Sequence, residues 1–201
     1  FPEGLISAMN FAIDKDGKTQ PASAFKGTVV VLDIGWKTLD AIKFVNGKFN
    51  LDNLDSVTWE DYGVFQNVVR PMLRDVRNMG DDFSRITDSD IERCIREGVT
   101  NGDWILNGGR QSVDLSKPYR HYASEFASKV SNRIIDLEYS EMRGYSGLLI
   151  VGGGGVMVTS HLREWYPEVA MELGKGITKG VTPYNANAIA GYRYMLAQAK
   201  K

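Results

Sequence analysis

Residues 28–34, which read TVVVLDI, constrain the fold more than any other stretch of the sequence. Almost every position is apolar or β-branched, so the stretch lacks the alternation of a strand that has one face in water. Such a continuous apolar run is typical of a central strand that is covered on both faces of its sheet. It therefore predicts a layered α/β architecture.

The other predicted elements fit this architecture. Strands over 39–45 and 48–54 flank Asn46-Gly47, the strongest short hairpin signal in the sequence. Hydrophobic periodicity and helix-end signals predict, in chain order, a helix over 4–12 before the strands, a helix over 61–79 ended by Gly80, a helix over 87–96 closed by Gly98, a small hairpin of 104–106 and 112–115, a long helix over 118–142, a strand over 148–151, a helix over 160–166 and a last helix from 187. The fold class is thus α/β, with a mixed sheet that opens with three strands and is flanked by helices.

Charge and composition limit the kinds of partner. The 201 residues carry a formal net charge of -1, so no global basic field favours nucleic acid or an anionic membrane. No apolar run approaches the roughly 20 residues of a membrane-spanning helix. The single cysteine, Cys94, cannot form an intrachain disulfide, which fits a reducing, cytoplasmic compartment. We therefore expect no direct contact with nucleic acid and none with a membrane.

The first segment that suits chemistry is 33–40, DIGWKTLD, at the turn after the central strand. A buried strand that delivers Asp33 into a tight turn suits binding of hydrated Mg²⁺ together with phosphates. Gly35 lets the backbone approach a ligand, and backbone N–H groups with the Thr38 hydroxyl can hold phosphate oxygens. The alternative is a polar β-turn whose aspartates cap their own backbone.

The second segment is 152–155, four glycines directly after the predicted strand 148–151. Consecutive glycines at a strand end let a flat ligand or a phosphate lie against bare backbone, although a flexible or tightly packed turn is the alternative. The dinucleotide-binding fingerprint is excluded because Met157 or Val158 stands where its third glycine is required, and no P-loop pattern occurs. A third segment, 183–191, has the small residues and asparagines of a closely packed helix start.

The order and separation of these three segments resemble the second half of the actin/Hsp70/sugar-kinase superfamily, and most closely its ParM-type plasmid-segregation actins. The resemblance covers essentially the whole chain. It implies an actin-like (ribonuclease H-like) domain with residues 1–14 as the first connecting helix, 28–182 as the nucleotide-binding domain and 183–201 as the second connecting helix. The family's first domain would be absent, and the beginning at Phe1 predicts a chain cut from a longer protein.

The resemblance also implies roles for single residues. Glu3 would position the attacking water as the catalytic residue, and Asp33 would hold Mg²⁺ through water. The phosphates would lie at Gly35, Trp36, Lys37, Thr38 and Asp40, and the adenosine would lie over Gly152, Gly153, Gly154 and Gly155. Arg93 and Arg96 would lie near the purine, or else are solvated surface arginines. Trp36 stands where the family usually has a small residue, which predicts a narrower phosphate loop or weakened turnover.

The function that the resemblance implies is an ATPase that forms filaments and segregates plasmid or other DNA. Its cofactors would be ATP or ADP, with GTP possible, and Mg²⁺. Its partners would be further copies of itself, the absent first domain and a DNA-bound adaptor protein. The chain alone would be essentially inactive. The alternatives are a non-polymerising kinase or switch protein of the same superfamily, a chaperone, and a stand-alone binding module.

Overall fold

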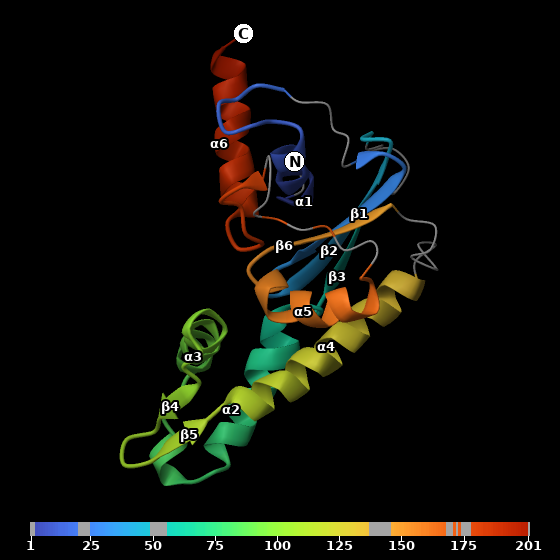
Figure 1. Ribbon diagram of the computed structural model, residues 1–201. Coiled ribbons are helices and arrows are strands. Elements are labelled where there is room, and N and C mark those ends of the chain that lie inside the picture. The colour runs from blue at the N-terminus through green and yellow to red at the C-terminus, as the bar shows by residue number, and fades with distance from the viewer. Residues whose placement is uncertain are drawn as a thin grey trace.

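The computed structural model describes residues 3–19, 25–48, 56–136, 146–167, 171, 173 and 178–200. Its main sheet has four strands in the order β3-β2-β1-β6 (Figure 1). These are β1 (Thr28–Ile34), β2 (Thr38–Val45), β3 (Ser56–Glu60) and β6 (Gly147–Val151). β1 pairs antiparallel with β2 and parallel with β6, so the predicted mixed sheet and its central strand are confirmed.

The alternating side chains of β1 enter two separate cores. Val30 and Leu32 belong to one cluster of buried residues, whereas Val29 and Val31 belong to the other, and all four are fully buried. The second cluster lies under α1 (Glu3–Ala8), the 3₁₀ turn Met9–Phe11 and α6 (Ala186–Ala199). The first lies under α5 (Gly155–Trp165) and the helices of the lower part in Figure 1. The strand is thus covered on both faces, as its apolar run predicted.

The turn after β2 is the one that Asn46-Gly47 predicted. Both residues have positive φ, 50° and 74°, and Val45 pairs with Lys48 across them. Glycine and asparagine adopt this conformation more readily than other residues, which is why the pair marks a tight hairpin turn. The third strand is found at Ser56–Glu60, after the predicted range 48–54, of which residues 49–54 lie outside the described residues.

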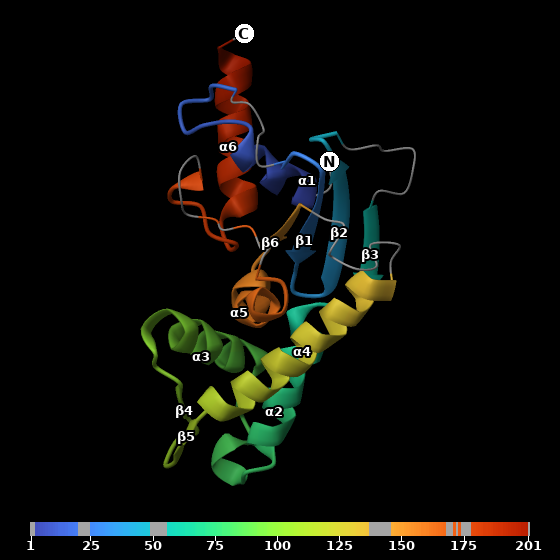
Figure 2. The same ribbon diagram turned by 45° about the vertical axis from the view of Figure 1, so that its right-hand side comes forward.

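A helical arm extends away from the sheet (Figure 2). It consists of a π-helical turn Phe65–Val69 that continues into α2 (Arg70–Arg77), a 3₁₀ turn Asp81–Phe83, α3 (Asp88–Asn101), the hairpin β4 (Ile105–Asn107) and β5 (Ser112–Asp114), and α4 (Ser116–Asp136). The predicted small hairpin and the existence of the long helix are confirmed. Residues 137–142 of the predicted long helix lie outside the described residues. No described helix is long and apolar enough to cross a membrane.

The predicted helix over 61–79 is found only over Phe65–Arg77, and the two larger boundary errors, at α3 and α5, both involve glycine. α3 does not close at Gly98 but continues to Asn101, where Gly102 at φ 78° forms the left-handed cap. Gly98 is needed for packing instead, because a Cβ there would lie 2.2 Å from Trp104 Cδ2. α5 begins at Gly155, five residues before the predicted start at 160, so the glycine turn leads directly into a helix.

Candidate functional site

The two turns singled out in the sequence lie side by side at one edge of the sheet. β1 and β6 are parallel neighbours, with Asp33 opposite Val151, so their carboxyl ends meet at the same edge. The turns are also bonded to each other, since Gly154 N–H donates to the Ile34 carbonyl at 2.8 Å. Ligands of α/β sheets bind outside the carboxyl ends of such strands, which makes this edge the candidate site.

The four glycines have different reasons to lack a side chain. A Cβ at Gly152, where φ is 86°, would lie 2.4 Å from Asp33 Oδ1. A Cβ at Gly154 would lie 2.2 Å from Val64 Cγ2, and one at Gly155 would lie 3.2 Å from Ile150 Cγ2. Gly153 is exposed, and its Cβ would meet only the Tyr184 ring, at 3.9 Å. Close packing thus explains the absence of a side chain at Gly152 and Gly154, whereas Gly153 presents bare backbone.

The turn 35–38 is fixed from outside the strand pair. Gly35 N–H donates to the Thr38 carbonyl at 2.9 Å, which closes the turn. The neighbouring segment then binds the turn, since the N–H groups of residues 63–65 donate to the three carbonyls of residues 35–37 at 2.9 to 3.2 Å. Trp36 packs its ring against Phe65, with centroids 5.2 Å apart, and stays 38% exposed. The predicted phosphate turn is therefore held rigidly against the start of the helical arm.

The carboxylates of this turn have distinct surroundings. Asp33 is only 3% exposed, and Asn187 of α6 donates Nδ2–H to its Oδ2 at 3.1 Å. Asp40 accepts from the Thr38 hydroxyl at 3.4 Å and from the Thr58 hydroxyl. Asp40 therefore links β2 to β3 and orients Thr38, while Asp33 is the carboxylate at the glycine turn. Lys37 is exposed beside them.

A cleft of about 700 Å³ lies next to the two turns. Its described lining residues come from the Trp36 turn, the glycine turn, α3 and the segment before α6: Trp36, Val64, Glu92, Ile95, Arg96, Val99, Thr100, Gly153, Gly154, Val156, Met157, Thr182 and Tyr184. The lining is mainly apolar, with a few polar groups at its margin, as is usual for small-molecule sites. Neither Thr182 nor Tyr184 was expected here, because the segment 183–191 was interpreted as a closely packed helix start and not as a ligand contact.

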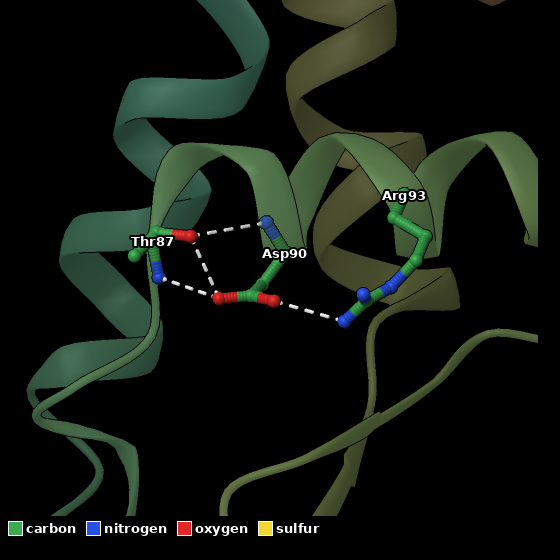
Figure 3. A network of polar contacts seen from close by, with 3 residues as sticks. All are labelled: Thr87, Asp90 and Arg93. Atoms are coloured by element: carbon green, nitrogen blue, oxygen red, sulfur yellow. Dashed lines mark hydrogen bonds and ion pairs between the residues drawn. The ribbon is translucent and has the colours of Figure 1, made fainter.

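The two predicted arginines of α3 have different surroundings. Arg96 lines the cleft and lies 4.0 Å from Glu92. Arg93 belongs to the helix cap instead, because its Nη2 donates to Asp90 Oδ1 at 2.8 Å (Figure 3). Hydrogen bonds from the hydroxyl and backbone N–H of Thr87 lower the pKa of the Asp90 carboxyl below its ordinary value of 3.8. The structure therefore brings Arg96 to the candidate site, and Arg93 is tied to the start of α3.

Glu3 is the first residue of α1, and α1 begins beside Asp33. A Cβ added to Gly4 would lie 3.5 Å from Asp33 Cβ and 3.0 Å from Ile42 Cδ1. The helix start therefore approaches the same strand that delivers the predicted metal carboxylate. The catalytic role of Glu3 stays a prediction.

Comparison with known proteins gives matches among solved structures alone. No protein-family pattern and no curated protein sequence matches the chain. An archaeal actin homolog in complex with ADP matches 100% of the chain at a TM-score of 0.71 and 15% identity, over 57% of its own length. Bacillus thuringiensis ParM with ATP matches 98% of the chain (TM-score 0.65, 14% identity), over 54% of its length.

A 15-stranded ParM filament from Clostridium botulinum matches 86% of the chain at a TM-score of 0.66 and 21% identity, over 46% of its subunit. The chain thus spans about half the length of the structures that it matches. Identities this low establish the fold and leave the activity open. The chain has an actin-like fold, the fold of the ParM-type proteins.

Proposed function

We propose that the chain binds a purine nucleotide, ATP or ADP with Mg²⁺, in the cleft between α3 and the glycine turn. The observation that carries the proposal is the position of two turns, one with the buried Asp33 and one with the bare backbone of Gly153, at one sheet edge beside that cleft. The ATP and ADP complexes among the structures with this fold support it. GTP is the alternative ligand, and competition between the two nucleotides distinguishes them.

The residues present fit a nucleotide and its metal. A flat base suits a cleft whose walls include Ile95, Val99 and Met157 and whose edge is the exposed Gly153. Mg²⁺ is typically held by one or two carboxylates and phosphate oxygens and keeps several waters, so the single buried Asp33 suits a water-mediated site. Mg²⁺, when bound, neutralises charge on the phosphates and on the phosphoryl group that is transferred.

The chain's own residues would then divide the work. Backbone N–H groups of the turn other than that of Gly35, which closes the turn, would hold the phosphates together with the Thr38 hydroxyl and the Lys37 ammonium. The Thr38 hydroxyl donates to Asp40 in the structure, so it would turn from Asp40 to a phosphate oxygen when nucleotide binds. In the complete protein Glu3 would position the attacking water, so Glu3→Ala should lower ATP turnover and leave the affinity for ATP unchanged.

A titration of the ¹⁵N-labelled chain with ADP and Mg²⁺ tests the nucleotide site. We expect saturable shifts of the backbone amide signals of Gly35 and Gly153. Arg96→Ala should weaken ADP binding by about 1 kcal/mol, or roughly fivefold, because the variant lacks the guanidinium that would face the purine ring in the cleft. Arg93→Ala is the matched control and should bind ADP like the parent chain. Equal losses in both variants, or amide shifts that do not saturate, would contradict the proposal.

We further propose that the nucleotide is clamped between this chain and another domain, which corresponds to the first domain of the ParM-type proteins. Tyr192 and Met195 of α6 are 58% and 64% exposed and lie one helical turn apart, which gives an apolar surface for such a domain. Without it, the chain should hydrolyse ATP negligibly. Addition of the first domain of a ParM-type protein, fused ahead of residue 1, should raise the affinity for ATP and restore turnover.

The complete protein is proposed to form filaments that segregate plasmid DNA through a DNA-bound adaptor. The ParM filament with this fold supports self-association. High-speed pelleting with Mg-ATP, with Mg-ADP and without nucleotide is the test. Polymer that requires ATP and disappears as phosphate is released would support a dynamic filament. Turnover without polymer would favour the alternative, a kinase or switch protein of the same fold.

A further inference from the structure

Asp33 accepts the last of two consecutive hydrogen bonds, which link it to α6 and, through α6, to α1. Asn187 of α6 donates its Nδ2–H to Asp33 Oδ2 at 3.1 Å. Ser7 of α1 in turn donates its hydroxyl to Asn187 Oδ1. Ser7 is fully buried and Asp33 is 3% exposed, so the first and the last residue of this Ser7–Asn187–Asp33 series are shielded from water.

The chemistry of the three groups fixes the orientation of the amide between them. An ionised carboxylate only accepts hydrogen bonds, whereas an asparagine side chain donates on its nitrogen side and accepts on its oxygen side. The nitrogen of the amide faces Asp33, because a reversed amide would set its oxygen against the carboxylate. A serine hydroxyl can donate or accept, and in this orientation that of Ser7 donates to Asn187 Oδ1. Asp33 therefore selects the orientation of the amide, and Ser7 anchors the oxygen side of that amide.

Further buried hydrogen bonds hold the backbone around Ser7 and Asn187 in place. Asn10 Nδ2–H donates to the Ser7 carbonyl at 3.1 Å and to the Ala186 carbonyl at 2.8 Å. Further along, Arg193 Nη1–H donates to the Asn10 carbonyl, also at 3.1 Å. Through Asn10, in the 3₁₀ turn after α1, these contacts join the end of α1 to α6 next to the Ser7–Asn187 hydrogen bond. The donor to Asp33 is thus supported by two helices rather than by one side chain alone.

The two oxygens of Asp33 are held in different ways. Oδ2 accepts from Asn187, and Oδ1 lies against the glycine turn, where a Cβ on Gly152 would come within 2.4 Å of it. Fixing Oδ2 therefore fixes the direction in which the carboxylate is presented at the turn. Partners that orient a ligating group in this way strengthen metal binding, and their loss typically lowers metal affinity by about 10- to 100-fold.

We propose that Asn187 is a positioning residue for Asp33, and that Ser7 acts through Asn187 by fixing its amide. This inference rests on the proposed function, in which Asp33 holds Mg²⁺ through water beside a bound nucleotide. Its specific consequence concerns the metal. Loss of Asn187 should weaken the part of nucleotide binding that depends on Mg²⁺ and leave the Mg²⁺-free part unchanged.

The test is the affinity for ADP with and without Mg²⁺, measured on the full chain by the same amide-shift titration. Asn187→Ala should lower the gain in ADP affinity on addition of Mg²⁺ by about tenfold or more. Asn187→Leu, which keeps the side-chain volume, should behave alike and guards against a loss caused by misfolding. Asn185→Ala is the matched control, because Asn185 bonds to Thr182 and Gly180, and should keep the parent ratio.

The double variant isolates the role of Ser7. Ser7→Ala alone should give a smaller loss of the Mg²⁺-dependent gain, and Ser7→Ala with Asn187→Ala should lose no more than Asn187→Ala by itself. Additive losses would overturn the role of Ser7. A parent-like ratio in both Asn187 variants would overturn the positioning role while nucleotide binding stands. If the parent chain binds ADP with no gain from Mg²⁺, or does not bind ADP, then the metal site or the proposed function itself fails.

Discussion

Substitution of two adjacent glycines by alanine separates a ligand contact from a packing requirement. At Gly154 a Cβ would lie 2.2 Å from Val64 Cγ2 and 2.9 Å from the Ile34 carbonyl oxygen, which accepts the Gly154 N–H. Forcing a methyl group into such a space costs about 1–3 kcal/mol. At Gly153 the nearest atoms of Tyr184 are 3.9 Å away, so the fold can accept the methyl group.

We therefore expect Gly154→Ala to lower the melting temperature by roughly 2–12 °C, since 1 kcal/mol corresponds to about 2–4 °C in a chain of this size. Gly153→Ala should leave the free energy of unfolding within about 0.5 kcal/mol of the parent value. Its effect should fall on binding, because a base that rests on the bare backbone of Gly153 would meet the new methyl group. The expected loss is about 1–3 kcal/mol, or roughly 5- to 150-fold in Kd for ADP.

Thermal unfolding followed by circular dichroism and ADP titration of the same two samples are the assays. The reasoning is refuted at the site if Gly153→Ala binds ADP as tightly as the parent chain. The packing argument is refuted if Gly154→Ala has the melting temperature of the parent chain, because Ile34 and Val64 would then accommodate the methyl group without a loss of stability.

Three further substitutions test other parts of the fold. Arg193→Met should destabilise the chain by about 1–3 kcal/mol for each of the two buried carbonyls that it leaves without this donor, as measured by urea unfolding. Asp90→Ala should cost about 0.3–1.5 kcal/mol at pH 7 through loss of the capping box with Thr87. Because the pKa of Asp90 is lowered in the folded state, this difference should be fully present above pH 3.8 and shrink as the pH falls below it. Gly98→Ala should lower the melting temperature despite the better helix propensity of alanine, because the Trp104 ring occupies the space; a higher melting temperature would contradict this.

The sequence was most informative where one physical requirement determines the pattern. The apolar run of β1 reflects its burial on both faces, and Asn46-Gly47 supplied the two positive φ angles of its turn. Glycine misled the prediction where its reason was tertiary. Gly98 looked like a helix end, yet it is required by a ring from the next element, and a local pattern cannot reveal such a neighbour.

The candidate site shows the same division. The turns of Asp33 and of residues 152–155 were found because each interrupts an apolar strand in a characteristic way. Asn187 could not be assigned to Asp33, since the two residues lie 154 positions apart and an asparagine at a helix start usually caps its own helix. Arg96 and Arg93 were equivalent in the sequence, and only the position of Asp90 at the helix start separated them.

The parallel pairing of β1 with β6 brings together two turns that lie far apart in the chain. The two turns at the sheet edge come from neighbouring strands, yet β2, β3 and the whole helical arm lie between them in the chain. The part of that excursion beyond residue 65 can lengthen, shorten or be exchanged without moving either turn, provided that β2 and residues 63–65, which bond to the first turn, stay in place and the chain returns to β6 in register. Since α3 in the excursion forms one wall of the cleft, the shape of that wall can change while the sheet edge that carries the two turns is preserved.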